Sequence, residues 1–219
     1  MISFMLNHDF QTAVKVLNDV RPDIMKTNDT RLKILWKTNM AIALERLDKL
    51  NEAESYLVEV IFELETIGAD TNLPRAYSVM GQIYEKRADL DSVLETTLLH
   101  KATEFYQKQF DVGQTLHKTT DMSEALQYMG GVYIKLGELE LARKSFIESI
   151  RLSRETDIPI LTFRSEIGLA KLIYITGNQT KACSLSTELS QRLDVDKSLI
   201  LNPTSRSFLD ELKSLCLID

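Results

Sequence analysis

Few residues of the chain have the types and spacing that chemistry requires. The three histidines, His8, His100 and His117, lie in different parts of the sequence and are not gathered at the spacings of a metal site. No nucleophile elbow, phosphate-binding loop, dinucleotide fingerprint or HExxH motif is present. Gly130 and Gly131 lie inside a helical pattern, where they cannot form a phosphate cradle. The sequence therefore predicts no catalytic residue, no metal site and no cofactor, and it does not predict an enzyme.

The charge balance and the hydropathy argue against two classes of partner. The chain has 26 Lys and Arg against 32 Asp and Glu, a net charge of −6 and a pI of about 5.2. Direct binding of nucleic acid is not expected, because phosphate contacts need clustered basic residues. No stretch approaches about 18 uninterrupted apolar residues, and the amino-terminal residues lack a signal-peptide pattern. We therefore expect a cytoplasmic protein that binds no membrane.

The two cysteines bear on the cellular compartment. Cys183 and Cys216 each lie among apolar residues of a helical pattern. The preferred interpretation is two buried, reduced thiols in a reducing compartment, and a disulfide between them is the alternative.

The strongest pattern in the sequence is a repeat of small residues. Five alanines recur at intervals of 40, 49, 40 and 40 residues: Ala13, Ala53, Ala102, Ala142 and Ala182. Each of the first four is followed, 28 residues later, by a second small residue: Ala41, Gly81, Gly130 and Ala170. The period is therefore 40 residues, with one insertion of nine residues between Gly81 and Ala102. Such a period is typical of stacked supersecondary units.

Large apolar residues keep the same register and predict two helices in each unit. Apolar residues three or four positions apart lie on one helical face. Gly137 and Gly177 suit the left-handed backbone that ends a first helix. Small residues are needed where the two helices of a hairpin touch. In the best-defined unit these are Gly130 and Ala142, with large residues on either side: Tyr133 and Phe146.

These residues resemble the tetratricopeptide repeat. The closest unit matches through Met129, Gly130, Tyr133, Gly137, Ala142 and Phe146, and the preceding unit through Met80, Gly81, Tyr84, Ala102 and Tyr106. The resemblance implies an all-α fold, an α-solenoid of antiparallel helix hairpins wound as a right-handed superhelix. The period of 40, against 34 in the commonest form, is similar to the long repeats in the sensor regions of bacterial peptide-responsive regulators.

The predicted organisation is a single array over residues 1–219. Its parts are a half unit at 1–20, units at 29–67, 72–110, 121–154 and 159–192, and a capping helix at 203–216. The nine extra residues lie within 88–101 and predict a second helix that starts about two and a half turns early. They are either a harmless extension or a docking and dimer contact. The truncated first unit is either a polar natural start or an edge that a partner covers.

The resemblance implies that first helices line a concave face that binds a ligand. The positions carried over for protein or peptide binding are Thr38, Asn39, Arg75, Gln82, Lys86, Gln127, Lys135, Arg164, Lys171 and Tyr174. Beyond residue 75 they are mostly basic or amide-bearing, which favours an acidic segment or a terminal carboxylate. The competing interpretation is a solvated helix face.

Two functions follow from the sequence. The first is a non-enzymatic protein- or peptide-binding module, as the sensor or effector part of a larger bacterial regulator. The alternative is an assembly scaffold that forms a homodimer through its amino-terminal edge or through the 88–101 insertion.

Overall fold

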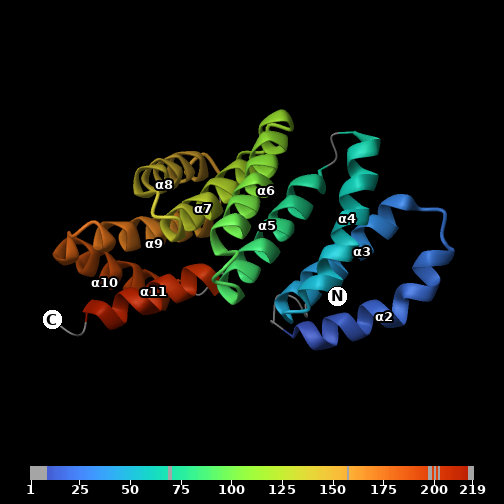
Figure 1. The fold of residues 1–219 in the computed structure, drawn as a ribbon, viewed down its shortest axis with the longest axis horizontal. Coiled ribbons are helices and arrows are strands. Elements are labelled where there is room, and N and C mark those ends of the chain that lie inside the picture. The colour runs from blue at the N-terminus through green and yellow to red at the C-terminus, as the bar shows by residue number, and fades with distance from the viewer. Residues whose placement is uncertain are drawn as a thin grey trace. The chain divides into compact units, whose positions relative to one another are not determined.

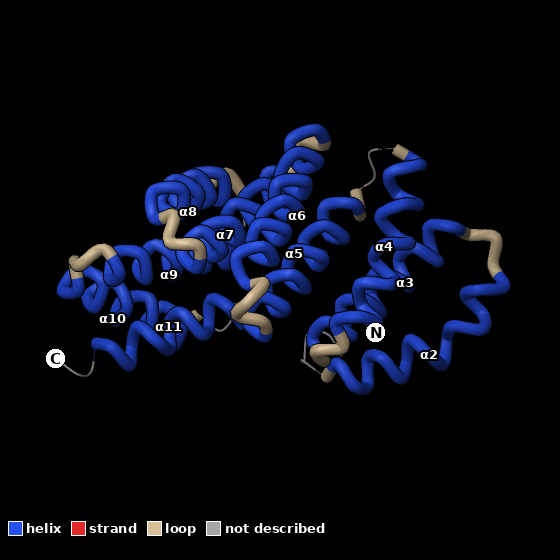
Figure 2. The backbone as a smooth tube through the Cα atoms, in the orientation of Figure 1, coloured by secondary structure: helices blue, strands red, loops and turns tan. Residues whose placement is uncertain are grey.

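A computed structural model describes residues 9–68, 71–156, 158–196, 199, 201 and 203–216. Within these ranges the chain forms helices and no strand (Figure 1, Figure 2). The helices are α2 (Phe10–Lys26), α3 (Thr30–Arg46), α4 (Leu50–Ile67), α5 (Leu73–Leu90), α6 (Glu95–Thr115), α7 (Thr119–Lys135), α8 (Leu139–Ser153), α9 (Pro159–Ile175), α10 (Gln179–Val195) and α11 (Pro203–Cys216). The chain divides into two compact units, Met1–Val112 and Gly113–Asp219. The predicted all-α class is confirmed. Residues 1–8 of the predicted half unit lie outside the described residues.

Left-handed residues make the tight turns between paired helices. Gly137 and Gly177 have φ of 75° and 94° in the turns after α7 and α9, as predicted. Asp48, with φ 58°, takes the same place after α3, five residues before the repeated alanine. Asp tolerates this conformation better than most residues with a Cβ. The side chains that cap helix amino termini are Asp9, Asp29 and Asn178.

The ring of Phe146 explains why α7 contains Gly130. A Cβ on Gly130 would lie 2.7 Å from Cε1 of Phe146, so the ring on α8 occupies the space that the glycine leaves. Gly168 on α9 makes room for the same ring, because a Cβ there would also overlap it. Phe146 is 1% exposed. Three helices of this unit therefore approach closely around one aromatic side chain.

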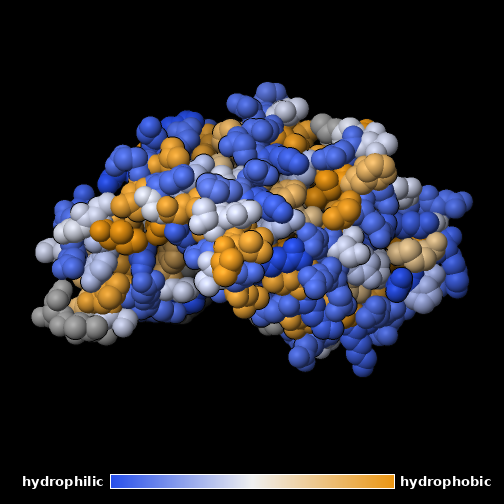
Figure 3. All heavy atoms as spheres, in the orientation of Figure 1, coloured by the Kyte–Doolittle hydropathy of each residue, from blue (hydrophilic) through white to orange (hydrophobic). Residues whose placement is uncertain are grey.

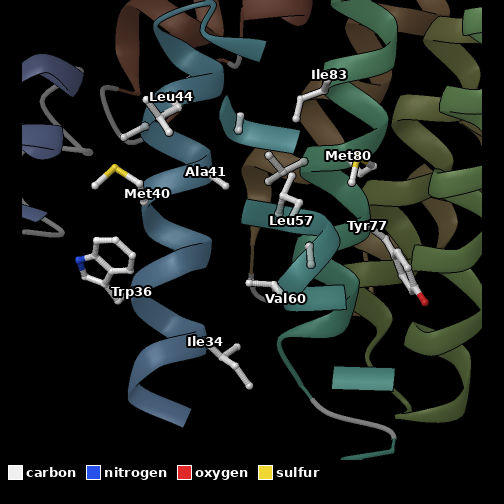
Figure 4. Close-up of a cluster of buried hydrophobic side chains, with 14 of the residues drawn as sticks. Ile34, Trp36, Met40, Ala41, Leu44, Leu57, Val60, Tyr77, Met80 and Ile83 are labelled. Atoms are coloured by element: carbon white, nitrogen blue, oxygen red, sulfur yellow. The ribbon is translucent and has the colours of Figure 1, made fainter. Parts of the chain in front are cut away.

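The same complementarity of size recurs along the chain. Tyr106 on α6 fills the space beside Gly81 on α5, as Phe146 does beside Gly130. Where the small residue is alanine, the residue at the position that corresponds to Phe146 is smaller than an aromatic ring. Figure 4 shows one such pair, with Ala41 facing Leu57. The four pairs are Ala41 with Leu57, Gly81 with Tyr106, Gly130 with Phe146, and Ala170 with Ser186.

The insertion lengthens both helices of its hairpin. α5 continues nine residues beyond Gly81, whereas α7 ends five residues beyond Gly130. α6 begins seven residues before Ala102, whereas α8 begins three residues before Ala142. Each helix thus gains four residues, about one turn, and the loop gains one. The sequence analysis predicted that only the second helix would be longer, and this was wrong. Both helices are longer, because equal extension keeps them paired along their whole length.

Helix α11, the predicted capping helix, packs against both α9 and α10. Its fully buried Leu209 and Leu212 belong to a cluster with Phe163 of α9 and other apolar side chains. A disulfide joins Cys183 on α10 to Cys216 on α11. The preferred interpretation of two reduced thiols was therefore wrong. The cysteines consequently give no support for a reducing compartment.

Adjacent glycines on α7 allow a matched test of this packing. We expect Gly130→Ala to lower the free energy of unfolding by about 1–3 kcal/mol, because the new methyl group overlaps the Phe146 ring. Gly131→Ala should raise it by about 0.5–1 kcal/mol, because no atom lies within 4 Å of the new Cβ and alanine favours a helix. Urea unfolding followed by circular dichroism measures both.

A second variant tests the cause of the destabilisation. Combining Gly130→Ala with Phe146→Leu should cost less than the two separate costs added together, since the smaller side chain no longer meets the methyl group. Equal effects of alanine at positions 130 and 131 would contradict this account of the hairpin.

Candidate functional site

The predicted binding residues all lie on first helices of hairpins, α3, α5, α7 and α9. On α3, Thr38 and Asn39 are 2% and 5% exposed. The Thr38 hydroxyl donates to the carbonyl of Ile34 at 2.8 Å, within its own helix. Both residues therefore belong to the packed interior of their unit, and a ligand would not reach them without rearrangement.

Charged and amide side chains lock α3 to α5. Arg46 donates to Gln82 Oε1 at 3.0 Å, and Lys86 donates to the Glu45 carbonyl and to Asp48, each at 2.7 Å. The Glu45 carboxylate is 1% exposed. Lys86 Nζ lies 3.0 Å from its Oε1 as an ion pair, without the geometry of a hydrogen bond. Gln82 and Lys86 therefore already have partners within the chain. Lys86 also supplies a cation for Glu45, which a buried carboxylate requires.

Arg75 is the predicted binding residue of α5 that faces solvent. It is exposed near the start of the helix, one turn before the buried Ser78. Among the predicted binding residues of α3 and α5, it is the cation best placed to meet an acidic group from outside.

Helix α7 carries a feature that the sequence did not predict. Gln127 is 5% exposed, and its Oε1 is buried with no hydrogen-bond partner. One turn later, a Cβ on Gly131 would meet no atom within 4 Å. Lys135, a further turn on, is half-buried. Residues four apart share a helical face, so an unsatisfied acceptor, a small hollow and a cation follow one another along α7.

Helix α9 lies beside α7 and presents the other predicted residues of this unit. Arg164 is half-buried. Lys171 is 7% exposed and forms an ion pair with Glu211 of α11. Tyr174 is half-buried against the apolar cluster that contains Phe163. The structure thus brings the α7 and α9 residues onto neighbouring helices, and α11 covers the Lys171 end.

Two features of the candidate site could not have been read from the repeat. Glu211 lies on α11, outside the 40-residue period, so no register position points to it. A Cβ on Gly130 would overlap the Phe146 ring of another helix, whereas a Cβ on Gly131 would meet nothing within 4 Å, and the sequence of α7 alone does not distinguish the two glycines.

The insertion ends in exposed apolar side chains. Leu90, Val93 and Leu94 are 79%, 90% and 49% exposed. We call these three residues the tip. Figure 3 shows hydrophobic atoms gathered where α5 ends and α6 begins. A surface pocket of about 430 Å³ elsewhere is lined by residues of α9, α10 and the segment after it, whereas the pocket beside the tip is about 380 Å³. Residues lining the latter include Asp48, Lys49, Leu50, Asn51, Glu52, Arg87 and Leu90.

Neither a metal centre nor a membrane span is found in the part of the chain that the structure describes. Its His, Cys, Asp and Glu side chains form no group of three that could hold a metal ion. None of the described helices is both long enough and apolar enough to cross a bilayer.

The perturbed ionisable groups of the first unit serve packing. Tyr84 of α5 stacks on Phe105 of α6, with ring centroids 5.5 Å apart. Arg87 and Tyr84 donate to Glu54 of α4 at 2.6 Å and 3.0 Å. The Arg87 hydrogen bond, with a smaller contribution from Tyr84, holds the pKa of the Glu54 carboxyl below its ordinary value, although burial opposes it. These groups join three helices, and Arg87 also lines the pocket beside the tip.

Replacing Arg87 tests this cluster through its pH dependence. A lowered pKa means that Glu54 stabilises the fold above its ordinary pKa of about 4.5, and that this contribution is lost as pH falls through the folded value. We expect Arg87→Gln to lower the free energy of unfolding by about 1–2 kcal/mol at pH 7, with allowance for partial exposure. The difference from the parent should shrink at pH 3. Urea unfolding at the two pH values measures it.

The exposed Arg151 supplies the control. It pairs with Glu148 on the surface of α8 and with Glu155 just after the end of that helix. Arg151→Gln should leave the urea midpoint unchanged at both pH values. A loss for Arg87→Gln that is as large at pH 3 as at pH 7 would show that Glu54 is not its source.

The fold and these faces define a helical-repeat module of tetratricopeptide type. A family model described as Tetratricopeptide Repeats-Sensor matches residues 9–132, more than half of the chain, and a tetratricopeptide repeat model matches residues 129–156. The chain belongs to the tetratricopeptide repeats-sensor family, and the resemblance found in the sequence is confirmed. No curated protein matches the chain.

Solved structures share the fold at low sequence identity. The apo form of RapI is similar with a TM-score of 0.69 and 9% identity, over 99% of this chain and 80% of that one. BtubC (BKLC) from P. vanneervenii has a TM-score of 0.64 and 14% identity, over 95% and 83%. A putative kinesin light chain from Podosopora anserina, with nearly identical TPR-like repeats, has a TM-score of 0.63 and 13% identity, over 89% and 92%. The predicted helical-repeat fold is confirmed.

Proposed function

We propose that the protein is a non-enzymatic module that binds a peptide or a protein segment, as the sensor part of a larger bacterial regulator. Its family is described as one of sensors, which supports this role. In this proposal the hairpins of both units are successive repeats of one array, and a cytoplasmic location goes with it.

The observation that carries the proposal is the hollow at Gly131. Glycine in a helix costs about 0.5–1 kcal/mol relative to alanine. No side chain of the described residues fills the space beside Gly131. Helix α7 nevertheless continues past this glycine without a break. A ligand backbone that crosses α7 there uses that space. Once the Gln127 side chain turns toward the hollow, an amide N–H of the ligand supplies the donor that its buried Oε1 lacks, and this removes the cost of an unsatisfied acceptor.

The cations of α7 and α9 favour an acidic ligand. Lys135 lies one turn beyond Gly131 on α7, and Arg164 lies on the neighbouring α9. A carboxylate that pairs with either gains a charge-assisted hydrogen bond. The ligand that fits best is therefore an extended segment with acidic side chains, bound along the face of α7 and α9.

Selection from a random peptide library displayed on phage tests the proposal. We expect the purified chain to enrich peptides rich in Asp and Glu. Their affinity, measured by fluorescence anisotropy, should fall about tenfold or more in Gly131→Leu, because the larger side chain fills the hollow. Gly131→Ala, with one methyl group, should lose less.

Matched charge variants show where the peptide lies. Lys135→Glu should weaken binding, whereas Lys144→Glu, on an exposed position of α8 in the same unit, should not. Enriched peptides that bind Gly131→Leu and the parent equally would place the ligand elsewhere, and a library without any consensus would count against a peptide ligand.

The exposed tip favours a second candidate, a scaffold that pairs with another copy of itself. The tip and the pocket lined by Arg87 and Leu90 are neighbours on one surface. A two-fold contact would place each tip beside the pocket of the other copy. Three side chains give a small interface, so this association should be weak.

Light scattering after size exclusion tests the scaffold. If it is correct, the parent should show a mass that rises with concentration, and the double variant Val93→Glu with Leu94→Glu should remain a monomer. Since both residues are exposed, circular dichroism should be unchanged. A monomeric parent at all concentrations would exclude self-association through the tip.

A further inference from the structure

Helix α11 is held in place by a disulfide, an ion pair and apolar contacts, which come from Leu209, Leu212 and the partly buried Phe208. Cys183 and Cys216 are half-buried, with Cα atoms 5.5 Å apart and a sequence separation of 33. Leu209 and Leu212 are fully buried against α9 and α10. Glu211, between them, pairs with Lys171. The disulfide therefore fastens the helix that covers a cation of the proposed binding face.

We propose that this disulfide is a redox-controlled fastener: its reduction by a dithiol loosens α11 and uncovers Lys171. The exposure of Lys171 after reduction does not depend on any ligand. Only its use, to make a further cation available to an acidic segment, rests on the proposed function.

The chemistry is ordinary thiol–disulfide exchange. A thiolate of the reductant attacks one Sγ, a new S–S bond forms as the Cys183–Cys216 bond breaks, and the displaced cysteine takes up a proton. The second thiol of the reductant then displaces the other cysteine and closes its own disulfide. Two electrons and two protons pass to the protein, and the reductant leaves as a cyclic disulfide. Because neither cysteine is fully buried, the bond can be approached from solvent.

Helix α11 depends on the disulfide to stay docked because it is short. The helix has 14 residues, a length at which an isolated helix is marginal in water. While the disulfide is closed, an undocked α11 stays tethered near its site, so undocking gains little freedom. After reduction, the undocked helix gains the conformational freedom of the opened loop. The free-energy difference between docked and undocked α11 is then smaller, and the undocked state is populated more.

Lys171 reports the undocking without any ligand. Its side chain is 8% exposed beneath Glu211, which is 50% exposed. When α11 lifts, the ammonium loses both its cover and its carboxylate partner. Lys144, on the exposed face of α8, keeps its surroundings in either redox state. The two lysines therefore form a matched pair for chemical labelling.

The experiment compares the full chain, oxidised and reduced by dithiothreitol, in two ways. An N-hydroxysuccinimide ester should label Lys171 at least about fivefold faster after reduction, and Lys144 equally in both states. Hydrogen exchange within 203–216 should accelerate at least about tenfold, while peptides from α7 and α8 stay unchanged. The double variant Cys183→Ser with Cys216→Ser should behave like the reduced chain and ignore dithiothreitol.

The outcomes separate this proposal from the proposed function. Unchanged labelling of Lys171 after complete reduction would overturn the fastener, whatever the chain binds. Exchange that accelerates equally in α7, α8 and α11 would also overturn it, since the bond would then be a general stabiliser. Failure to select a peptide leaves the labelling result intact and counts only against the ligand.

Discussion

The meeting of a small residue on one helix with a larger residue on its partner, clearest between α5 and α6 and between α7 and α8, is the constraint on which the structure depends. Two helices approach closely where one of them has a small side chain or none, and the other must then fill the remaining space. Phe146 does this for three helices at once, between Gly130 and Gly168. The ring sets how α7 and α9 lie beside each other, and so sets the face on which Gln127 and Arg164 stand. The proposed binding face is therefore a consequence of core packing.

Charge performs a second structural task in the first unit. The nearly inaccessible Glu45 carboxylate would be costly without a cation, and Lys86 and Arg46 provide two. The same side chains reach across to their neighbouring helix, so they hold α3 against α5. A basic residue in the register of a ligand-binding position is thus not by itself evidence of a ligand. Its partners within the chain decide whether it is available.

The sequence predicted what depends on local order and missed what depends on single distant contacts. The 40-residue period located the hairpins and the turns at Gly137 and Gly177, because turn geometry and helical periodicity act over a few residues. The division of the insertion between two helices, the disulfide and the burial of Lys171 were not predicted. Each requires knowing which helix lies opposite, and α11 has no counterpart in the repeat from which to infer it. Within the candidate face, the residue positions followed from the register, whereas their exposure did not.

The asymmetry of the Lys171–Glu211 pair bears on how a ligand and α11 could share one cation. The ammonium is buried and the carboxylate is half exposed. Removing Glu211 without replacement would leave a poorly solvated charge, which is costly. A carboxylate from an acidic segment that takes its place preserves the pairing, so the exchange costs mainly the contacts that α11 gives up. In the proposed redox control, giving up those contacts costs least when the disulfide is open, because the undocked helix then gains conformational freedom. Binding of an acidic segment at α9 and release of α11 should therefore favour each other, because both change the same equilibrium.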